Sequence, residues 1–492
     1  MFSGSVSKGN IFSVSPGGAM YDLLAFRQRG IDVMTQSSGH LWRTITVLIV
    51  IVAAVTGSSL LIAPAADAQQ PSTPSSNAQA TDARNPDVNK AIEKFQNMDF
   101  DGALKSLEAA CEKNSDLAPA QIQMANFFAQ ANQTQGVLVW LERAVIAAPD
   151  DPAAYVIMGD VARQESRVTE AFVLYTEAVK RLKTFSKSPA RKLVLEPQAL
   201  SGLAAVAEAR GDWATAQKHL EAALSVDPKN AVSMVRLARA LFQQKLAAEC
   251  YSKLKEAYQL DKQNVLNPEA SLAMYYEQYG DRKNAKKWMG YALNAAPKDV
   301  KTLLVAGQWA LQAGQLDDAL TQSTTALNVD PKSGDALLLR GSVAMFQKDY
   351  KTAETYFQQA YIQTPSNLAV CNQLALSLCE QEGESKKRQA LEYATTLARQ
   401  SQKSPEAAAT YGWVLYQNGQ KQEAERILRS AMSAGNITAD MAYYLAAVLM
   451  DRERRTDDKP AEAAKQLLDA AVKTPRPFYK RQEAEMLLAK IR

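Results

Sequence analysis

Few side chains in this sequence have the types and spacing that catalysis or metal binding requires. Its two histidines are His40 and His219, too few for a zinc site built from several imidazoles. The sequence also lacks the HExxH, paired CxxC, GxxxxGK and GxGxxG motifs of zinc enzymes, phosphate-binding loops and dinucleotide-binding folds. We therefore predict no catalytic residue, no metal site and no cofactor, and we interpret His219 as a surface residue of a helix.

Charged residues are frequent, but their arrangement does not indicate an acid–base site. Acidic and basic residues alternate in stretches such as DRKNAKK and DRERRTDDK, a pattern typical of solvated helical surfaces. The formal net charge of the 492-residue chain is +4, too close to zero to predict nucleic-acid binding. An enzyme is accordingly the third of the functions considered below.

The most regular feature of the chain is a small residue that returns at a spacing of about 34. The clearest series is Ala110, Ala144, Ala178, Ala223, Ala257, Ala292, Ala326, Ala360, Ala431 and Ala471, with Leu397 in the equivalent place before Ala431. Two further series of small residues run in phase with it. A fixed period of this length is typical of a unit that cannot bury its apolar face alone and stacks on copies of itself.

Each unit is predicted to contain two helices, because apolar residues recur within it at intervals of three and four. Glycine marks the turn between the helices in four units, where a left-handed backbone ends the first helix: Gly211, Gly280, Gly314 and Gly419. Proline follows the second helix, at Pro149, Pro228, Pro297, Pro331 and Pro365. The small residues are expected where two helices cross closely, so that enlarging one should cost roughly 1–3 kcal/mol.

This pattern resembles the tetratricopeptide repeat family, whose units are 34-residue helical hairpins with small residues at these places and a closing proline. The stretches SGDALLLRGSVAMFQKDYKTAETYFQQAYIQTPSN and DVKTLLVAGQWALQAGQLDDALTQSTTALNVDPKS match it most closely. The resemblance covers about residues 85 to 475 in about eleven repeats and implies an all-α solenoid of stacked helix-turn-helix repeats, wound as a right-handed superhelix. The sequence departs from the family pattern in the first and last units, at Leu397, and at inserts in the third, ninth and eleventh units.

The resemblance also implies that first helices line a concave groove for a protein or peptide partner. Carried over unit by unit, the partner-binding residues include Asn126, Asp160, Arg163, Arg239, Met274, Gln308, Asn372, Trp413 and Tyr416. Gln243, Gln278 and Gln312 join the predicted set from the recurring glutamines described next. This mixed set lacks the repeated Lys/Asn pairing that clamps a C-terminal carboxylate in some family members. That kind of ligand is therefore not predicted.

Glutamine recurs in phase near the end of the first helix, at Gln96, Gln130, Gln164, Gln243, Gln278, Gln312 and Gln417. A row of amides can bond along an extended backbone, since each offers two donors and an acceptor. The alternative, which we favour, is that glutamine is simply a good helix former at an exposed helix end.

A second candidate surface is the basic insert after the third unit, which contains Lys180, Arg181, Lys183, Lys187, Arg191 and Lys192 with no acid before Glu196. Such a patch suits an acidic protein or anionic lipid headgroups. A solvated loop without a specific ligand is the favoured alternative.

The four cysteines are predicted to be buried small residues without disulfides. Cys111 and Cys250 are about four units apart, whereas Cys371 and Cys379 are eight residues apart on one helix, roughly 12 Å along its axis. Both separations are beyond the reach of a disulfide.

The start of the chain resembles a targeting segment. Residues 44–66 carry no charge and end near a small-x-small cleavage pattern at Ala66 and Ala68. We interpret residues 1–33 as an upstream extension with a doubtful start codon, and residues 34–68 as a signal peptide. The alternative is an uncleaved membrane anchor through residues 44–66. In either case the repeats lie outside the cytoplasm, periplasmic, secreted or membrane-anchored.

The remaining boundaries follow from composition. Residues 69–86 form a linker rich in Ser, Pro, Ala and Gln, residues 87–474 the solenoid, and residues 475–492 a capping helix that covers the last exposed core. We expect an exported, non-catalytic scaffold that binds protein partners along its groove. The alternative is a structural subunit of an envelope assembly or of secretion or polymer-export machinery that contacts folded partners. The sequence indicates neither the partner nor the oligomeric state.

Overall fold

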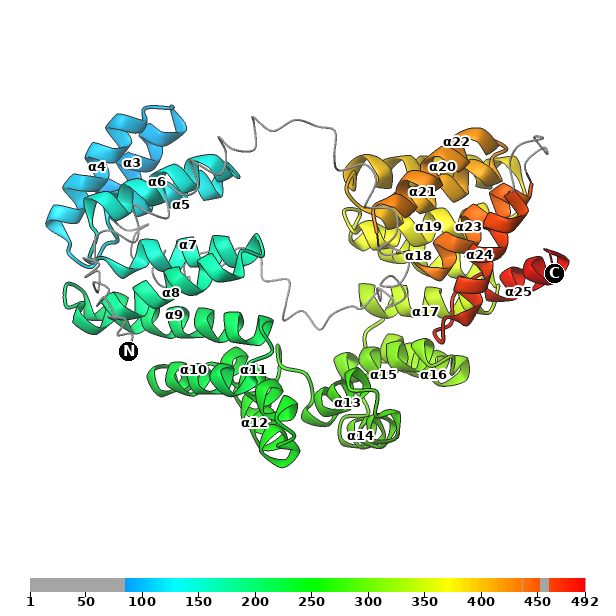
Figure 1. Ribbon diagram of the computed structural model, residues 1–492, viewed down its shortest axis with the longest axis horizontal. Coiled ribbons are helices and arrows are strands. Elements are labelled where there is room, and N and C mark those ends of the chain that lie inside the picture. The colour runs from blue at the N-terminus through cyan, green and yellow to red at the C-terminus, as the bar shows by residue number, and fades with distance from the viewer. Residues whose placement is uncertain (1–84, 436, 452–459, 492) are drawn as a thin grey trace, which may run out of the picture. The chain divides into compact units, whose positions relative to one another are not determined.

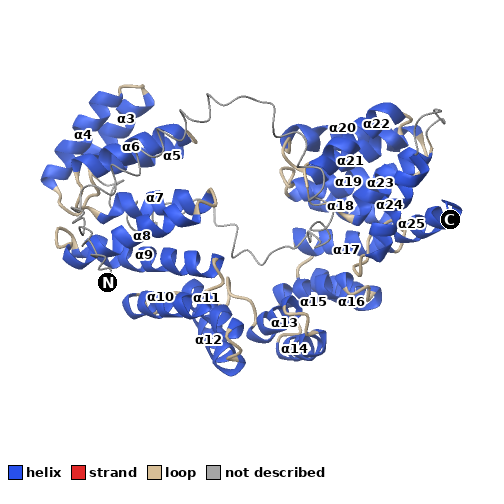
Figure 2. Cartoon of the chain, in the orientation of Figure 1, coloured by secondary structure: helices blue, strands red, loops and turns tan. Residues whose placement is uncertain are grey.

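The computed structural model describes residues 85–435, 437–451 and 460–491. The predicted upstream extension, leader, membrane segment and nearly all of the linker lie outside these residues. The helices described below belong to one unit. Within the described ranges every regular element is a helix and none is a strand (Figure 2), which confirms the all-α prediction.

The helices follow one another as eleven hairpins, each made of a first helix (A helix) and a second helix (B helix), and a last single helix (Figure 1). The A helices are α3 (Pro86–Gln96), α5 (Ala120–Gln130), α7 (Pro152–Gln164), α9 (Pro189–Ala209), α11 (Ala231–Gln243), α13 (Pro268–Gln278), α15 (Val300–Gln312), α17 (Gly334–Phe346), α19 (Leu368–Cys379), α21 (Pro405–Gln417) and α23 (Ala439–Met450). The B helices are α4 (Phe100–Lys113), α6 (Thr134–Ala147), α8 (Val168–Thr184), α10 (Trp213–Val226), α12 (Ala247–Leu260), α14 (Arg282–Ala295), α16 (Leu316–Val329), α18 (Tyr350–Gln363), α20 (Glu384–Gln400), α22 (Lys421–Ser433) and α24 (Pro460–Lys473). The single helix is α25 (Arg481–Ile491).

Each A helix packs most extensively on the B helix that follows it, and each hairpin packs on the next. This confirms the predicted solenoid of stacked helix-turn-helix repeats. The helices begin where the sequence supplies caps: Asn230, Asp299 and Ser333, for example, accept a hydrogen bond from a backbone N–H in the first turn of α11, α15 and α17.

In nine of the described hairpins the turn between A and B helix contains one residue in the left-handed conformation. Gly211, Gly280, Gly314 and Gly419 adopt it with φ between 71° and 78°, as their positions predict. The same place is taken by residues with a side chain in five other hairpins: Met98, Asn132, Ser166, Lys245 and Lys348. The repeat therefore imposes this conformation even where the sequence does not supply glycine.

The small residues lie where the helices cross. Ala103, Ala171 and Ala319, from the start of three B helices, are fully buried. Large side chains fill the space that glycines leave: a Cβ on Gly341 would lie 2.3 Å from Cε1 of Phe357, a residue with no exposed surface. The inferred reason for the small series, close helix crossing, therefore has a direct structural counterpart.

Tyr175 in α8 shows the same complementarity across three helices. Its ring would be 2.7 Å from a Cβ on Gly159 of α7 and 2.4 Å from a Cβ on Gly202 of α9. The ring is fully buried, and its hydroxyl donates to Oδ1 of Asp160 at 2.7 Å. One tyrosine thus joins two successive A helices.

The inserts in the third and ninth units lengthen helices. In the third unit α8 has 17 residues, and the following α9 has 21, with Pro197 inside it. In the ninth unit α20 also has 17 residues, compared with 14 in α18. The added turns extend a hairpin without interrupting the stacking of its neighbours.

Candidate functional site

All twelve predicted partner-binding residues lie in A helices, on α5, α7, α11, α13, α15, α19 and α21. We call the surface of the A helices that carries them the A face. Most of these side chains are half-buried, Gln278 is exposed, and Trp413 is buried with 2% of its surface accessible. The structure therefore brings the set onto one kind of helix but leaves its members with different access to a partner.

In the third unit, the A-face residue Asp160 is already engaged within the protein. Its carboxylate accepts the hydroxyl of Tyr175, and burial together with the Asp160 charge raises the pKa of that tyrosine well above its usual range. Arg163, one turn further on, also interacts with the hydroxyl of Tyr175. This part of the A face therefore stabilises the hairpin packing.

Two tryptophans bond to an acid one repeat earlier. Nε1 of Trp309 in α15 donates to Oε2 of Glu277 in α13 at 3.0 Å. Nε1 of Trp413 in α21 donates to Oε1 of Glu380, the C-cap residue of α19, at 2.9 Å. These bonds link successive A helices. Sequence reasoning missed Glu380, although an acid followed about one period later by tryptophan occurs twice and would have indicated the contact.

Two more predicted residues make bonds of this kind. Oδ1 of Asn372 accepts the hydroxyl of Thr410 at 2.6 Å, and the hydroxyl of Tyr416 donates to Oδ2 of Asp451 at 3.0 Å. Tyr416 and Asp451 also line an open pocket of about 380 Å³. On α19 and α21 the predicted partner-binding residues therefore contribute to the stacking of repeats.

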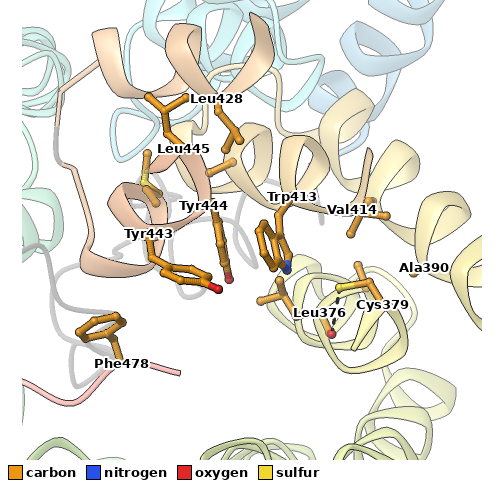
Figure 3. Packing of buried hydrophobic residues seen from close by; sticks show 14 of the residues in the cluster. Leu376, Cys379, Ala390, Trp413, Val414, Leu428, Tyr443, Tyr444, Leu445 and Phe478 are labelled. Atoms are coloured by element: carbon orange, nitrogen blue, oxygen red, sulfur yellow. Dashed lines mark hydrogen bonds between the residues drawn. The ribbon is translucent and has the colours of Figure 1, made fainter. Parts of the chain in front are cut away.

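Aromatic side chains surround Trp413 (Figure 3). Its ring stacks on that of Tyr444 with 4.6 Å between centroids and 16° between planes, and the ring of Tyr443 lies at 5.7 Å. Phe478, from the segment before α25, belongs to the same buried cluster. Trp413, predicted to face a groove, is thus covered by Tyr443 and Tyr444 of α23 and has Lys480 beside its ring.

The middle of the A face is more open. The Arg239 guanidinium lies 6.0 Å from the centre of the Trp213 ring, and Met274 packs at the edge of the cluster formed by Ala270 and Ala273. In the described part of the chain, the side-chain amides of Gln243, Gln278, Gln308 and Gln312 bond to no other residue.

The seven in-phase glutamines share one position in the fold. Each is the last residue of its A helix, in α3, α5, α7, α11, α13, α15 and α21. This position agrees with the favoured interpretation of glutamine as a helix-end residue. The same position also places an amide at the same point of successive hairpins. The hypothesis that these amides bind an extended backbone therefore stays a prediction.

The basic insert is not a free cluster of six charges. Arg191 forms two bonds to the Asp151 carboxylate at 2.8 and 2.7 Å, and the two side chains are only 13% and 3% exposed. Arg181 pairs with Glu177 and donates to the carbonyl of Pro149. Of the six positive charges, that of Arg191 is therefore paired inside the protein, and those of Arg181 and Lys180 pair with Glu177 nearer the surface. Lys183 and Lys187 are exposed.

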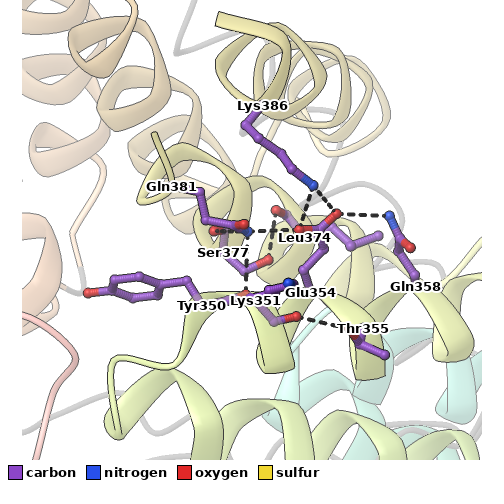
Figure 4. Close-up of polar contacts among 9 residues, drawn as sticks. All are labelled: Tyr350, Lys351, Glu354, Thr355, Gln358, Leu374, Ser377, Gln381 and Lys386. Carbon is purple, nitrogen blue, oxygen red and sulfur yellow. Dashed lines mark hydrogen bonds and ion pairs between the residues drawn. The ribbon is translucent and has the colours of Figure 1, made fainter. Parts of the chain in front are cut away.

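Buried polar contacts also join B helices. In Figure 4 the Glu354 carboxylate of α18 receives the ammonium of Lys386 from α20 at 2.6 Å and the amide of Gln381 at 2.8 Å. Glu354 is 7% exposed, so its charge depends on these donors. The network links the eighth and ninth hairpins.

No group of three or more His, Cys, Asp or Glu side chains in the described ranges could hold a metal ion. His219, expected at the surface, is half-buried in α10, and burial together with the neighbouring Lys218 lowers its pKa. None of the four cysteines, all within the described residues, forms a disulfide, in agreement with the prediction.

Membrane association was tied to residues 44–66, which lie outside the described residues. Among helices α3 to α25, none combines the length and the apolar character needed to cross a bilayer.

Comparison with known proteins agrees with the repeat pattern. Two tetratricopeptide repeat family models match residues 207–252 and 304–367. No curated protein matches the chain.

Several solved structures are similar to it. They include a tetratricopeptide repeat protein from Parabacteroides merdae (15% identity, 60% of this chain and 98% of that chain covered, TM-score 0.39) and yeast Tom70 (14%, 84% and 95%, 0.34). TTC0263, a thermophilic TPR protein of Thermus thermophilus, is also similar (18%, 39% and 98%, 0.33). The two family matches show that the chain contains tetratricopeptide repeats, and the same stacked helix pairs continue through the other described hairpins.

Proposed function

We propose that this protein is an exported, non-catalytic scaffold that binds a protein partner along the A face of its central repeats. Tetratricopeptide repeat proteins generally bind protein or peptide partners and are generally non-catalytic. The observation that carries the proposal is the set of unengaged amides in α11, α13 and α15. Gln243, Gln278 and Gln312 are 35 and 34 residues apart at the ends of successive A helices, and each amide can both donate to and accept from an extended backbone.

The export part of the proposal is supported by the sequence of residues 34–68. Mass spectrometry of the protein recovered from outside the cytoplasm tests it. We expect the first peptide to begin at Gln69. Peptides from residues 1–33 would contradict the proposed start, and an intact segment 44–66 would favour the membrane anchor.

Site-specific photo-crosslinking tests the binding surface. A photoreactive residue at Gln278 on the A face should crosslink to a partner, whereas the same group at Ile146 of α6, a B-helix residue that is 74% exposed, serves as the matched control. Combined replacement of Gln243, Gln278 and Gln312 by alanine should then weaken capture of that partner. Unchanged capture by the triple variant would leave the amides as helix-end residues only.

A second candidate is a structural subunit of an envelope assembly or export machinery. It is favoured by apolar side chains exposed on B helices near the start of the solenoid: Val139 (46%) and Ile146 (74%) in α6, and Phe172 (40%) and Val173 (37%) in α8. Exposed apolar groups on neighbouring helices suit contact with a folded protein. Crosslinks from Ile146 and none from Gln278 would support this candidate over the first.

A further inference from the structure

The segment before and at the start of α25 lies on the A helices of the last four repeats. We call residues 478–483 the strap. The ring of Tyr479 is 4.6 Å from that of Phe346 at the end of α17, and its hydroxyl donates to Oε1 of Gln373 in α19 at 3.3 Å. These contacts join residues more than one hundred positions apart, across four hairpins.

Lys480 is the most deeply engaged residue of the strap. Its ammonium pairs with the Glu380 carboxylate, and the two side chains are 9% and 12% exposed. The same ammonium lies 5.8 Å from the centre of the Trp413 ring and 5.9 Å from that of Tyr350. A carboxylate and two aromatic faces together form a receptor for a cation.

The strap is also bound through its backbone and at its far end. The N–H of Lys480 donates to Oδ1 of Asp440 in α23 at 3.3 Å. The ammonium of Lys348, in the turn after α17, contacts Oε1 of Gln482 at 2.9 Å and Glu483 at 3.1 Å. Side chains of the strap and one of its backbone N–H groups are therefore bound by α17, α19, α21 and α23, and by the turns that follow two of these helices.

These contacts exceed what covering the end of a solenoid requires. Apolar residues of α25, such as Ala484 and Leu488, are buried against the last hairpin, and a polar outer surface would complete a cap. A buried ion pair adds a desolvation cost that a cap does not need. The contacts of Tyr479 and Lys480 have instead the character of ligand recognition, with an aromatic anchor and a paired cation.

We propose that the A face of the last four repeats is a peptide-binding site for an aromatic residue followed by lysine, and that the strap fills it as an intramolecular ligand. A partner segment with the same aromatic-lysine chemistry displaces the strap. The proposal rests on the proposed function, in that it assigns the partner chemistry of one part of the A face.

The test uses the full chain carrying Tyr479→Ala and Lys480→Glu, which removes the anchor and reverses the cation. The probe is a fluorescent synthetic peptide of residues 474–485, and a matched peptide carries Lys480→Glu. Binding is followed by fluorescence anisotropy. Hydrogen exchange reports separately whether the strap is released and whether α17 to α23 stay protected.

We expect the wild-type peptide to bind the double variant and to bind the unmodified chain at least about tenfold more weakly, because a filled site lowers apparent affinity by the fraction that is open. The peptide with Lys480→Glu should lose binding to the double variant. Adding Glu380→Lys to the double variant should restore binding of that peptide.

Two outcomes would overturn the proposal. If α17 to α23 remain protected in the double variant and the peptide still does not bind, the site recognises no ligand in trans. If α17 to α23 lose protection together with the strap, the segment is part of the core. Crosslinking from Gln278 concerns the fifth to seventh repeats, so the proposed function can fail or succeed independently of this result.

Discussion

Adding a methyl group at Gly341 tests whether close helix crossing dictates the small residues of this repeat. A Cβ at this place would lie 2.3 Å from Cε1 and 2.6 Å from Cδ1 of Phe357, and the ring has no exposed surface into which to move. Gly290, in the interior of α14, is the matched control because nothing lies within 4 Å of its added Cβ.

The magnitude follows from two opposing effects. Alanine in place of glycine inside a helix stabilises by about 1 kcal/mol, and Gly290→Ala should show this gain alone. Overpacking at Gly341→Ala costs roughly 1–3 kcal/mol, which cancels or exceeds the same gain. The two variants should therefore differ by about 1–3 kcal/mol, with Gly341→Ala the less stable.

Urea unfolding of the full chain, followed by circular dichroism, measures the difference. Hydrogen exchange resolved by helix should place the loss at Gly341→Ala in α17 and α18, since repeat arrays open locally. Phe357→Leu in the Gly341→Ala background should recover part of it by giving the methyl group room. Equal stabilisation by both alanines would refute the reasoning.

Three further predictions concern the turns, the strap and the thiols. Gly280→Ala should destabilise by about 1–2 kcal/mol in urea unfolding, because φ there is 78°; Lys245→Gly, which relieves the same left-handed strain, should not. Burial raises the pKa of Asp440 to about 7 from 3.8. Because the folded-state pKa of Asp440 is raised, its carboxyl group stabilises the folded protein below pH 4, and this contribution is lost as the pH rises through 7. Hydrogen-exchange protection of the strap should therefore fall between these two pH values. If Asp440→Asn changed strap protection by the same amount at every pH, this reasoning would be contradicted. The intact mass should be the same with and without reductant, and a disulfide-linked mass would contradict the absence of disulfides among the four cysteines. Alkylation of the native protein should favour Cys111 and spare Cys379, because burial raises the pKa of the Cys379 thiol well above its usual value.

The fold could be predicted because its determinants are local and repeated. Small residues at a fixed spacing, turn glycines such as Gly314 and closing prolines such as Pro331 each report on one hairpin, and each hairpin packs on its neighbours. The sequence did not reveal that Lys348 and Met98 occupy the same left-handed turn position, because neither residue type favours it.

The contents of the A face were less predictable because they depend on contacts distant in the chain. The position of Trp413 in a first helix was predicted, but its ring is covered by Tyr444 of α23 and by Lys480, whose local sequences contain no sign of this contact. Arg191 was counted in a basic patch, yet it pairs with Asp151, forty residues earlier. Periodicity locates a helix surface, whereas its accessibility depends on which remote side chain covers it.

The packing of Tyr175 between Gly159 and Gly202 limits how this array can evolve by gain or loss of hairpins. Phe357 against Gly341 and Leu428 against Gly412, where an added Cβ would lie 2.8 Å away, follow the same rule with different partners. The hairpins of this array therefore cannot replace one another freely. Duplicating, deleting or exchanging one of them would place a ring against a methyl group or leave a cavity beside a glycine. The order of the hairpins is constrained by matched volumes, so lengthening this chain requires new pairs of large and small residues at every junction.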